Sequence, residues 1–329
     1  MLAGAAGGPK WLVLHGLDNY IFSDLLSSVQ KPVDLIGSSI GAWRYTKYCH
    51  GDFQTAFKQF DDIYFGQTYL ENATLKDVSD EIERMLNVLF PEGCEQEILA
   101  NPKFRINIFA DASRGIIKSD NPWVIGPTLL LATVANMLHR KAIQWFFKRY
   151  LFHHPAAVPP LHPFQDYPTN LDALTTANLK SAVMASGAIP MVVNGVNMPG
   201  INNTNFRDGG LIDYHLTLDY KMNDGLILMP HFSPKVITNW LDKYVPWREP
   251  ILTGWDRVVL VTPSEEFIDA LPLQKIPDRS DFKRFKSDDN ARNSYWREVT
   301  NRSELMAEEL QRLIEQQDIA SVIEPLENL

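Results

Sequence analysis

Long apolar runs are absent from this sequence. No window reaches the roughly eighteen apolar residues that a membrane-spanning helix needs. The first residues have neither a basic segment nor a long apolar core, so we predict no secretory signal peptide. Cysteine is also scarce: Cys49 and Cys94 allow one disulfide, but a reducing compartment is the simpler interpretation. We therefore expect a cytoplasmic protein that contacts membranes only peripherally.

Positive charge is in deficit as well. The chain has 31 Lys and Arg against 40 Asp and Glu, a formal net charge of −9. This balance argues against a nucleic-acid-binding protein, which needs a basic face. No cluster of Cys and His has metal-ligand spacing, and neither common glycine-rich nucleotide motif is present. We predict neither a metal nor another cofactor.

The order of periodic segments is typical of an α/β protein. Short apolar strands separated by helices imply a mostly parallel sheet, and we predict a three-layer α/β/α fold in a single catalytic domain over 1–329. The region 235–329 is less informative. Strands are predicted at 1–6, 33–36, 104–110, 226–229 and 258–261, and helical periodicity at 10–26, 42–50, 53–64, 75–89, 173–186 and 304–317.

The segment 121–165 contains no Asp or Glu, although the chain as a whole is acidic. It is rich in aromatic and aliphatic residues and carries four His together with Arg140, Lys141, Lys148 and Arg149. Cations beside aromatic side chains on a helix suit an anionic lipid surface. We interpret the segment as a helical insertion that acts as a lid or a peripheral membrane contact; the alternative is a pair of helices that cover the core.

A G-x-S-x-G pattern occupies residues 37–41, between an apolar strand and a helix-like segment. In this context the pattern is typical of a nucleophile elbow, where a sharp turn holds a serine Oγ clear of the sheet at a helix N-terminus. Ser39 is thus the best candidate for a catalytic residue. Only about one strand precedes it, which is unusually early for an α/β-hydrolase with a histidine triad.

A second candidate lies at Asp208-Gly209-Gly210, in a stretch that we predict to be rich in turns. Two glycines after an aspartate let a tight loop present its carboxylate with little steric obstruction. Asp208 alone is more simply a turn residue, but together with Ser39 it becomes a candidate base.

With these motifs the chain resembles the patatin-like phospholipases over roughly residues 1–230. The segment Gly7-Gly8-Pro9-Lys10 is similar to the later part of that family's G-G-G-x-R-G loop, and residues 37–41 match its elbow. Residues 185–190 match the A-S-x-A-x-P segment, and residues 208–210 match D-G-G. All four motifs occur in the family's order.

The resemblance implies a Ser-Asp dyad, in which Ser39 is the nucleophile and Asp208 takes its proton without a histidine. It also implies an oxyanion hole at the backbone N–H groups of Gly7 and Gly8, with Ile40 and Lys10 as further substrate contacts. The implied substrate is an acyl lipid: a phospholipid, a lysophospholipid or a neutral ester. The loop departs from the family pattern at Ala6, Pro9, Lys10 and Trp11.

Two alternatives remain at this point. Altered residues in the glycine-rich loop are compatible with a catalytically weak or inactive protein that binds lipid or a partner. His215 and His231 follow Asp208 in the chain and would serve an ordinary Ser-His-Asp esterase. A lone histidine near a strand end is more often structural, and the oligomeric state has no signature in the sequence.

Overall fold

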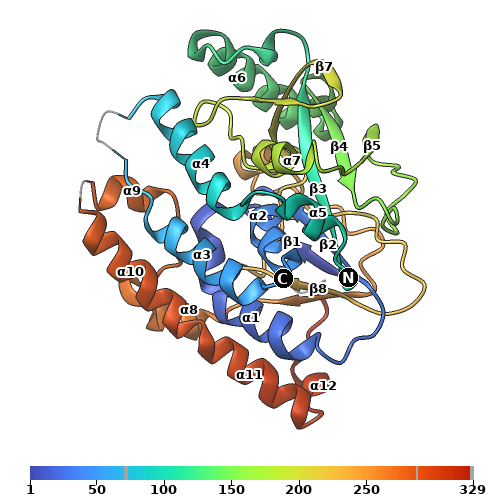
Figure 1. Ribbon diagram of the computed structural model, residues 1–329, viewed down its shortest axis with the longest axis vertical. Coiled ribbons are helices and arrows are strands. Elements are labelled where there is room, and N and C mark those ends of the chain that lie inside the picture. Colours follow the sequence, from blue (N-terminus) through green and yellow to red (C-terminus); the bar gives the residue numbers. More distant parts are fainter. Residues whose placement is uncertain (70–72, 287, 327–329) are drawn as a thin grey trace. The chain divides into compact units, whose positions relative to one another are not determined.

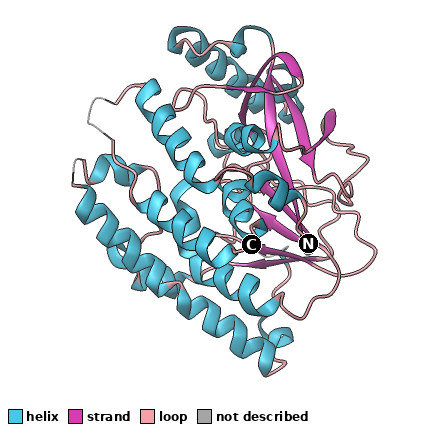
Figure 2. Ribbon diagram, in the orientation of Figure 1, coloured by secondary structure: helices cyan, strands magenta, loops and turns pink. Residues whose placement is uncertain are grey.

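The structure is a computed structural model that describes residues 1–69, 73–286 and 288–326 (Figure 1). These residues form a mixed α/β architecture, in which Figure 2 separates the strands from the helices by colour. Nine strands form one sheet, with the order β5-β4-β3-β2-β1-β8-β9 and with β6 and β7 joined to it through β3. The prediction of a mostly parallel sheet is confirmed. The strands are β1 (Leu2–Gly4), β2 (Val33–Ser38), β3 (Phe104–Ser113), β4 (Phe147–His153), β5 (Thr169–Ala173), β6 (Val196–Met198), β7 (Ile201–Asp208), β8 (Ile227–Pro230) and β9 (Val258–Val261).

Most predicted helices are present, some with shifted ends. The helix predicted over 173–186 begins only at Leu179: Ala173 is the last residue of β5, which pairs with β4, and residues 174–178 are neither helix nor strand. Within the described residues, no helix combines the length and the hydrophobicity that crossing a membrane requires. The helices are α1 (His15–Tyr20), α2 (Ile40–Thr46), α3 (Phe53–Phe65), α4 (Leu75–Leu89), α5 (Cys94–Leu99), α6 (Pro122–Leu138), α7 (Leu179–Ser186), α8 (Glu265–Ala270), α9 (Ser280–Arg284), α10 (Asp289–Arg302), α11 (Glu304–Glu315) and α12 (Ile319–Val322).

The chain divides into two compact units. Unit 1 consists of Met1–Ala6, Lys31–Leu228 and Val236–Val259, and unit 2 of Gly7–Gln30, Met229–Lys235 and Leu260–Leu329. The single catalytic domain over 1–329 stays a prediction. In unit 2 the helices α1 and α11 approach closely: the Gly16 N–H donates to the Ser303 hydroxyl at 2.8 Å, and a Cβ at Gly16 would lie 2.6 Å from the Ser303 carbonyl oxygen.

Strand β3 organises unit 1. One edge of β3 pairs with β4 over Ile108–Ser113. The other edge pairs first with β2, in parallel, as far as Phe109, and then with the antiparallel strand β7 from Ala110 to Ala112. Strands β2 and β7 therefore meet end to end along one edge of β3. The stretch before Asp208 is this strand β7, so the prediction of turns there is wrong; pairing with β3 and β6 satisfies its backbone.

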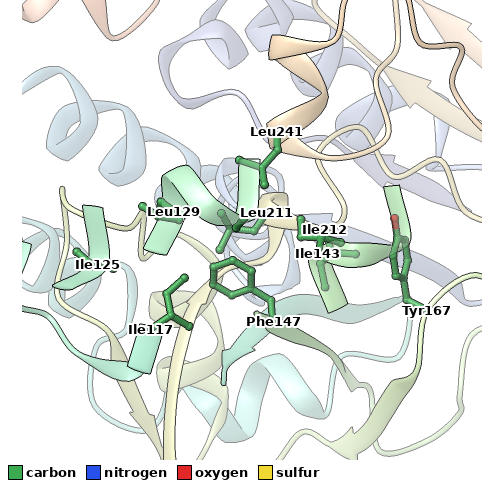
Figure 3. Packing of buried hydrophobic residues seen from close by; sticks show 10 residues of the cluster. Ile117, Ile125, Leu129, Ile143, Phe147, Tyr167, Leu211, Ile212 and Leu241 are labelled. Carbon is green, nitrogen blue, oxygen red and sulfur yellow. The ribbon is translucent and has the colours of Figure 1, made fainter. Parts of the chain in front are cut away.

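The segment 121–165 is helical only in its first half. Helix α6 and a 3₁₀ turn at Arg140–Trp145 are followed by β4, which is an internal strand of the sheet. The prediction of a helical insertion is thus wrong from Phe147 onward, because β3 and β5 pair with this stretch. Figure 3 shows that α6 contributes Ile125 and Leu129 to a buried apolar cluster.

Candidate active site

The turn between β2 and α2 holds Ser39 in an unusual backbone conformation. Its φ is 54° and its ψ is −127°, in a region that costs a residue other than glycine about 1–3 kcal/mol. Glycine is required on both sides by close backbone contacts. A Cβ at Gly37 would lie 2.5 Å from the Ala42 backbone, and one at Gly41 would lie 1.9 Å from the Gly4 carbonyl oxygen. Residues 37–41 therefore form the sharp strand-to-helix turn that the G-x-S-x-G pattern predicts.

Ser186 holds this turn from the end of α7. The Ser39 N–H donates a 2.8 Å hydrogen bond to the Ser186 hydroxyl oxygen, and the Ser186 hydroxyl donates in turn to the Phe109 carbonyl at 2.7 Å. The Ser186 side chain is fully buried. The serine of the A-S-x-A-x-P segment thus fastens the elbow to β3, a role that the motif alone does not reveal.

Asp208 is the last residue of β7. Its N–H donates to the Ala188 carbonyl at 3.0 Å, and its Oδ1 accepts a 2.8 Å hydrogen bond from the Gly210 N–H. Gly209 cannot carry a side chain, because a Cβ would lie 2.2 Å from the Phe109 carbonyl oxygen. The glycines after Asp208 thus allow a tight 3₁₀ turn that fixes one carboxylate oxygen and directs the other.

The structure brings Ser39 and Asp208 together. Ser38 pairs with Phe109 and Asp208 with Ala110, so the two strand ends lie at neighbouring positions on one edge of β3. The Ser39 hydroxyl donates a hydrogen bond to Asp208 Oδ2 at 2.7 Å. Both residues are buried, with 3% and 6% of their surfaces exposed. The candidate nucleophile and the candidate base thus lie within hydrogen-bond reach, which direct proton transfer between them requires.

A model of the family described as patatin-like phospholipase matches residues 13–217. The chain belongs to the patatin-like phospholipase family. The matched residues contain both the elbow and Asp208, and membership suggests a lipid acyl hydrolase. No curated protein matches the chain significantly.

The glycine-rich loop precedes the part of the chain that matches the patatin-like family model. Gly7, Gly8 and Lys10 belong to unit 2. Gly8 has a φ of +56°, and a Cβ at Gly7 would lie 2.7 Å from the Phe232 ring. Lys10 Nζ lies over that ring at 4.5 Å; burial lowers the pKa of Lys10, and Asp278 opposes this effect. The oxyanion and substrate roles of these residues stay predictions, as does that of Ile40, the first residue of α2.

The two histidines of the triad alternative are buried in local contacts. His215 Nδ1 accepts a hydrogen bond from the Ile237 N–H at 3.0 Å, and its ring stacks on Tyr214. His231 Nδ1 accepts a hydrogen bond from the Ser233 N–H at 3.2 Å. The Ser39 hydroxyl of this patatin-like protein, by contrast, donates its hydrogen bond to the carboxylate of Asp208.

Sequence reasoning missed a buried ionic cluster behind the Asp208 turn. Arg149 donates to both oxygens of Asp213 at 2.8 Å and to both oxygens of Asp166 at 2.7 and 2.9 Å. The composition of the segment 121–165 predicts that Arg149 is a cation suited to a lipid surface, but only 1% of its side chain is exposed. Nothing in the local sequence marks it, since its partners lie 17 and 64 residues away.

The carboxyl groups of Asp111, Asp166 and Asp213 lie in this cluster around Arg149. Burial raises the pKa of Asp213 to about 7, although Arg149 acts in the opposite direction. Burial also raises the pKa of Asp111 well above its usual range, and Asp213 and Asp208 raise it further. Asp111 Oδ2 accepts a 3.0 Å hydrogen bond from the Ile212 N–H, four residues after Asp208. The cluster therefore braces the segment that carries the candidate base.

Proposed function

We propose that this protein is a serine-dependent lipid acyl hydrolase that cleaves acyl esters through an acyl-serine intermediate. The observation that carries the proposal is the 2.7 Å hydrogen bond from the Ser39 hydroxyl to Asp208 Oδ2 at a strained strand-to-helix turn. Family membership supports the choice of lipid acyl esters as the substrate class.

In the first half of the reaction, Asp208 accepts the proton of the Ser39 hydroxyl while Oγ attacks the ester carbonyl carbon. The bond from Gly210 to Oδ1 leaves Oδ2 directed at the nucleophile. The tetrahedral intermediate then collapses: its bond to the alcohol oxygen breaks, and that oxygen takes the proton from Asp208. The products are the free alcohol and an acyl-Ser39 ester.

The second half repeats this chemistry with water. Asp208 accepts a proton from a water molecule as its oxygen attacks the acyl-serine carbonyl carbon. Collapse of the second intermediate releases the carboxylic acid and returns the proton to Ser39 Oγ. One group thus serves as base and then as acid in each half, so no histidine is needed.

The negative charge of each intermediate requires donors. We assign the backbone N–H groups of Gly7 and Gly8 to this role on the strength of the glycine-rich motif, with the N–H of Ile40 as a third donor. Pro9 lacks an N–H and cannot contribute. Lys10 is assigned to substrate contact, where its cation suits a lipid phosphate as a point charge.

The experiment is hydrolysis of short-chain and long-chain p-nitrophenyl esters, together with labelling by a fluorophosphonate probe. Ser39→Ala should abolish labelling, and both Ser39→Ala and Asp208→Asn should lower kcat/KM by roughly 10³-fold or more. His215→Ala serves as the matched control and should keep its activity per folded molecule. Folded wild-type protein that neither labels nor turns over ester would instead be a patatin-like binding protein, and loss of activity in His215→Ala would favour the triad.

A further inference from the structure

Helix α6 exposes a continuous apolar face. Its outward residues recur with helical spacing, and 17 successive positions from Pro122 to Leu138 include no charged residue. Trp123 at the start is 89% exposed and Leu138 at the end is 85% exposed. Large hydrophobic side chains this exposed, on one helix face, mark an interaction surface. The docking face consists of Trp123, Leu130, Leu131, Val134, Met137 and Leu138.

The opposite face of α6 belongs to a buried apolar cluster. Ile125 and Leu129 join a buried cluster with Leu211 and Ile212, which follow directly after Asp208-Gly209-Gly210 (Figure 3). All of these residues belong to unit 1. The helix that carries the docking face therefore shares one apolar cluster with the residues that follow the candidate base.

The chemistry around the docking face fits a lipid bilayer with anionic headgroups. Exposed tryptophans stand at its start and just after its end, at Trp123 and Trp145, and indole rings favour the interface between headgroups and acyl chains. Exposed cations lie beside it at Lys118 and Lys141. No Asp or Glu occurs from 121 to 165, and the preceding Asp120 is paired with Arg207 at 2.5 Å. Cations at the rim of an apolar face are complementary to lipid phosphates.

We propose that α6 docks this protein on anionic lipid bilayers, with its outward side chains in the interfacial layer. The choice of a bilayer as the occupant rests on the proposed lipid acyl hydrolase function. Docking brings the protein to the bilayer that holds acyl esters, whereas a water-soluble ester needs no docking.

The binding test uses flotation with vesicles of phosphatidylcholine, with and without phosphatidylserine. The protein carries Ser39→Ala throughout, so that hydrolysis cannot alter the vesicles. We compare this protein with Leu130→Gln/Leu131→Gln on α6, where glutamine preserves helix propensity. Leu226→Gln/Ile323→Gln is the matched control. Leu226 and Ile323, at 59% and 58% exposed, are about as accessible as Leu130 and Leu131.

Binding should be stronger to vesicles that contain phosphatidylserine. The α6 variant should bind at least about tenfold more weakly, because it lacks the two leucine side chains whose transfer from water into the bilayer favours binding. The control variant should bind as strongly as the protein with unsubstituted α6. Absence of binding by the Ser39→Ala protein, or equal loss in both variants, overturns the proposal. A dimer in sedimentation velocity that dissociates in the α6 variant, without vesicle binding, assigns the face to a second copy of the chain and also overturns it.

Activity separates docking from chemistry in the protein with Ser39 intact. Leu130→Gln/Leu131→Gln should lower hydrolysis of phospholipid in vesicles at least about tenfold and leave a short soluble p-nitrophenyl ester unaffected. Equal rates on vesicles contradict the docking role. If no ester is hydrolysed at all, the proposed function fails, but the flotation result still decides the docking surface.

Discussion

The hydroxyl of Ser186 holds the Ser39 turn through two hydrogen bonds, and the substitution Ser186→Ala removes both. The Ser39 N–H loses its acceptor and the Phe109 carbonyl loses a donor. Because Ser186 is fully buried, water does not reach the site to replace the hydroxyl. The substitution tests whether this hydroxyl positions the nucleophile.

The expected cost follows from these two contacts. Each of the two buried backbone groups that loses a partner costs about 1–3 kcal/mol, so we expect the free energy of unfolding to fall by roughly 2–6 kcal/mol. Activity should fall as well, because the strained turn at Ser39 loses its anchor. A nucleophile displaced by about 1 Å can lose on the order of 10²-fold in rate, so we expect kcat to fall by about 10- to 100-fold.

Urea denaturation measures the stability, and ester hydrolysis under conditions where the variant is fully folded measures kcat and KM separately. Ser38→Ala is the control: Ser38 is equally buried, and its hydroxyl has no hydrogen-bond partner among the described residues. That variant should keep its stability within about 1 kcal/mol. Equal effects of the two substitutions, or a Ser186→Ala protein that keeps full kcat, would refute this reasoning.

Two further predictions concern the ionic cluster. Arg149→Met leaves the Asp213 carboxylate buried without its main partner and should cost about 3–5 kcal/mol in urea denaturation; a cost below about 1 kcal/mol would contradict the buried pair. Asp111→Asn keeps an acceptor for the Ile212 N–H but cannot ionise. Folding raises the pKa of Asp111 above its unfolded value of about 4. The protonated carboxyl group contributes its full share of the wild-type stability below about pH 4, and this contribution is lost as the pH rises from there toward the folded pKa. The Asn variant should therefore gain stability relative to wild type as the pH rises above about 4, and parallel pH profiles in urea denaturation would exclude this.

The sequence predicts best those structural elements whose signal lies within a few consecutive residues. The apolar strand before Ser39 and the glycines at 37 and 41 make this turn recognisable within a short window, although the contact that excludes a side chain at Gly41 comes from Gly4 on β1. The family model then agrees with the resemblance drawn from the motifs. The pairing of Ser39 with Asp208 could only be expected from that resemblance, because 169 residues separate the two.

Long-range pairing explains what could not be predicted. The local sequence of β7 predicts turns, because asparagine favours loops. Pairing with β3 and β6 makes this segment a strand. Arg149 resembles a surface cation beside aromatic residues, yet carboxylates from distant segments neutralise it in the interior. Local periodicity carries no information about either outcome.

The end-to-end meeting of β2 and β7 on one edge of β3 has a consequence for the order of assembly. Chain growth produces β2, then β3, and β7 only much later. A chain that ends before residue 201 has the elbow with Ser39 but no carboxylate from β7 beside it. The hydrogen-bonded pair is therefore completed only once synthesis has passed Asp208, and products of translation that end before it lack the pair.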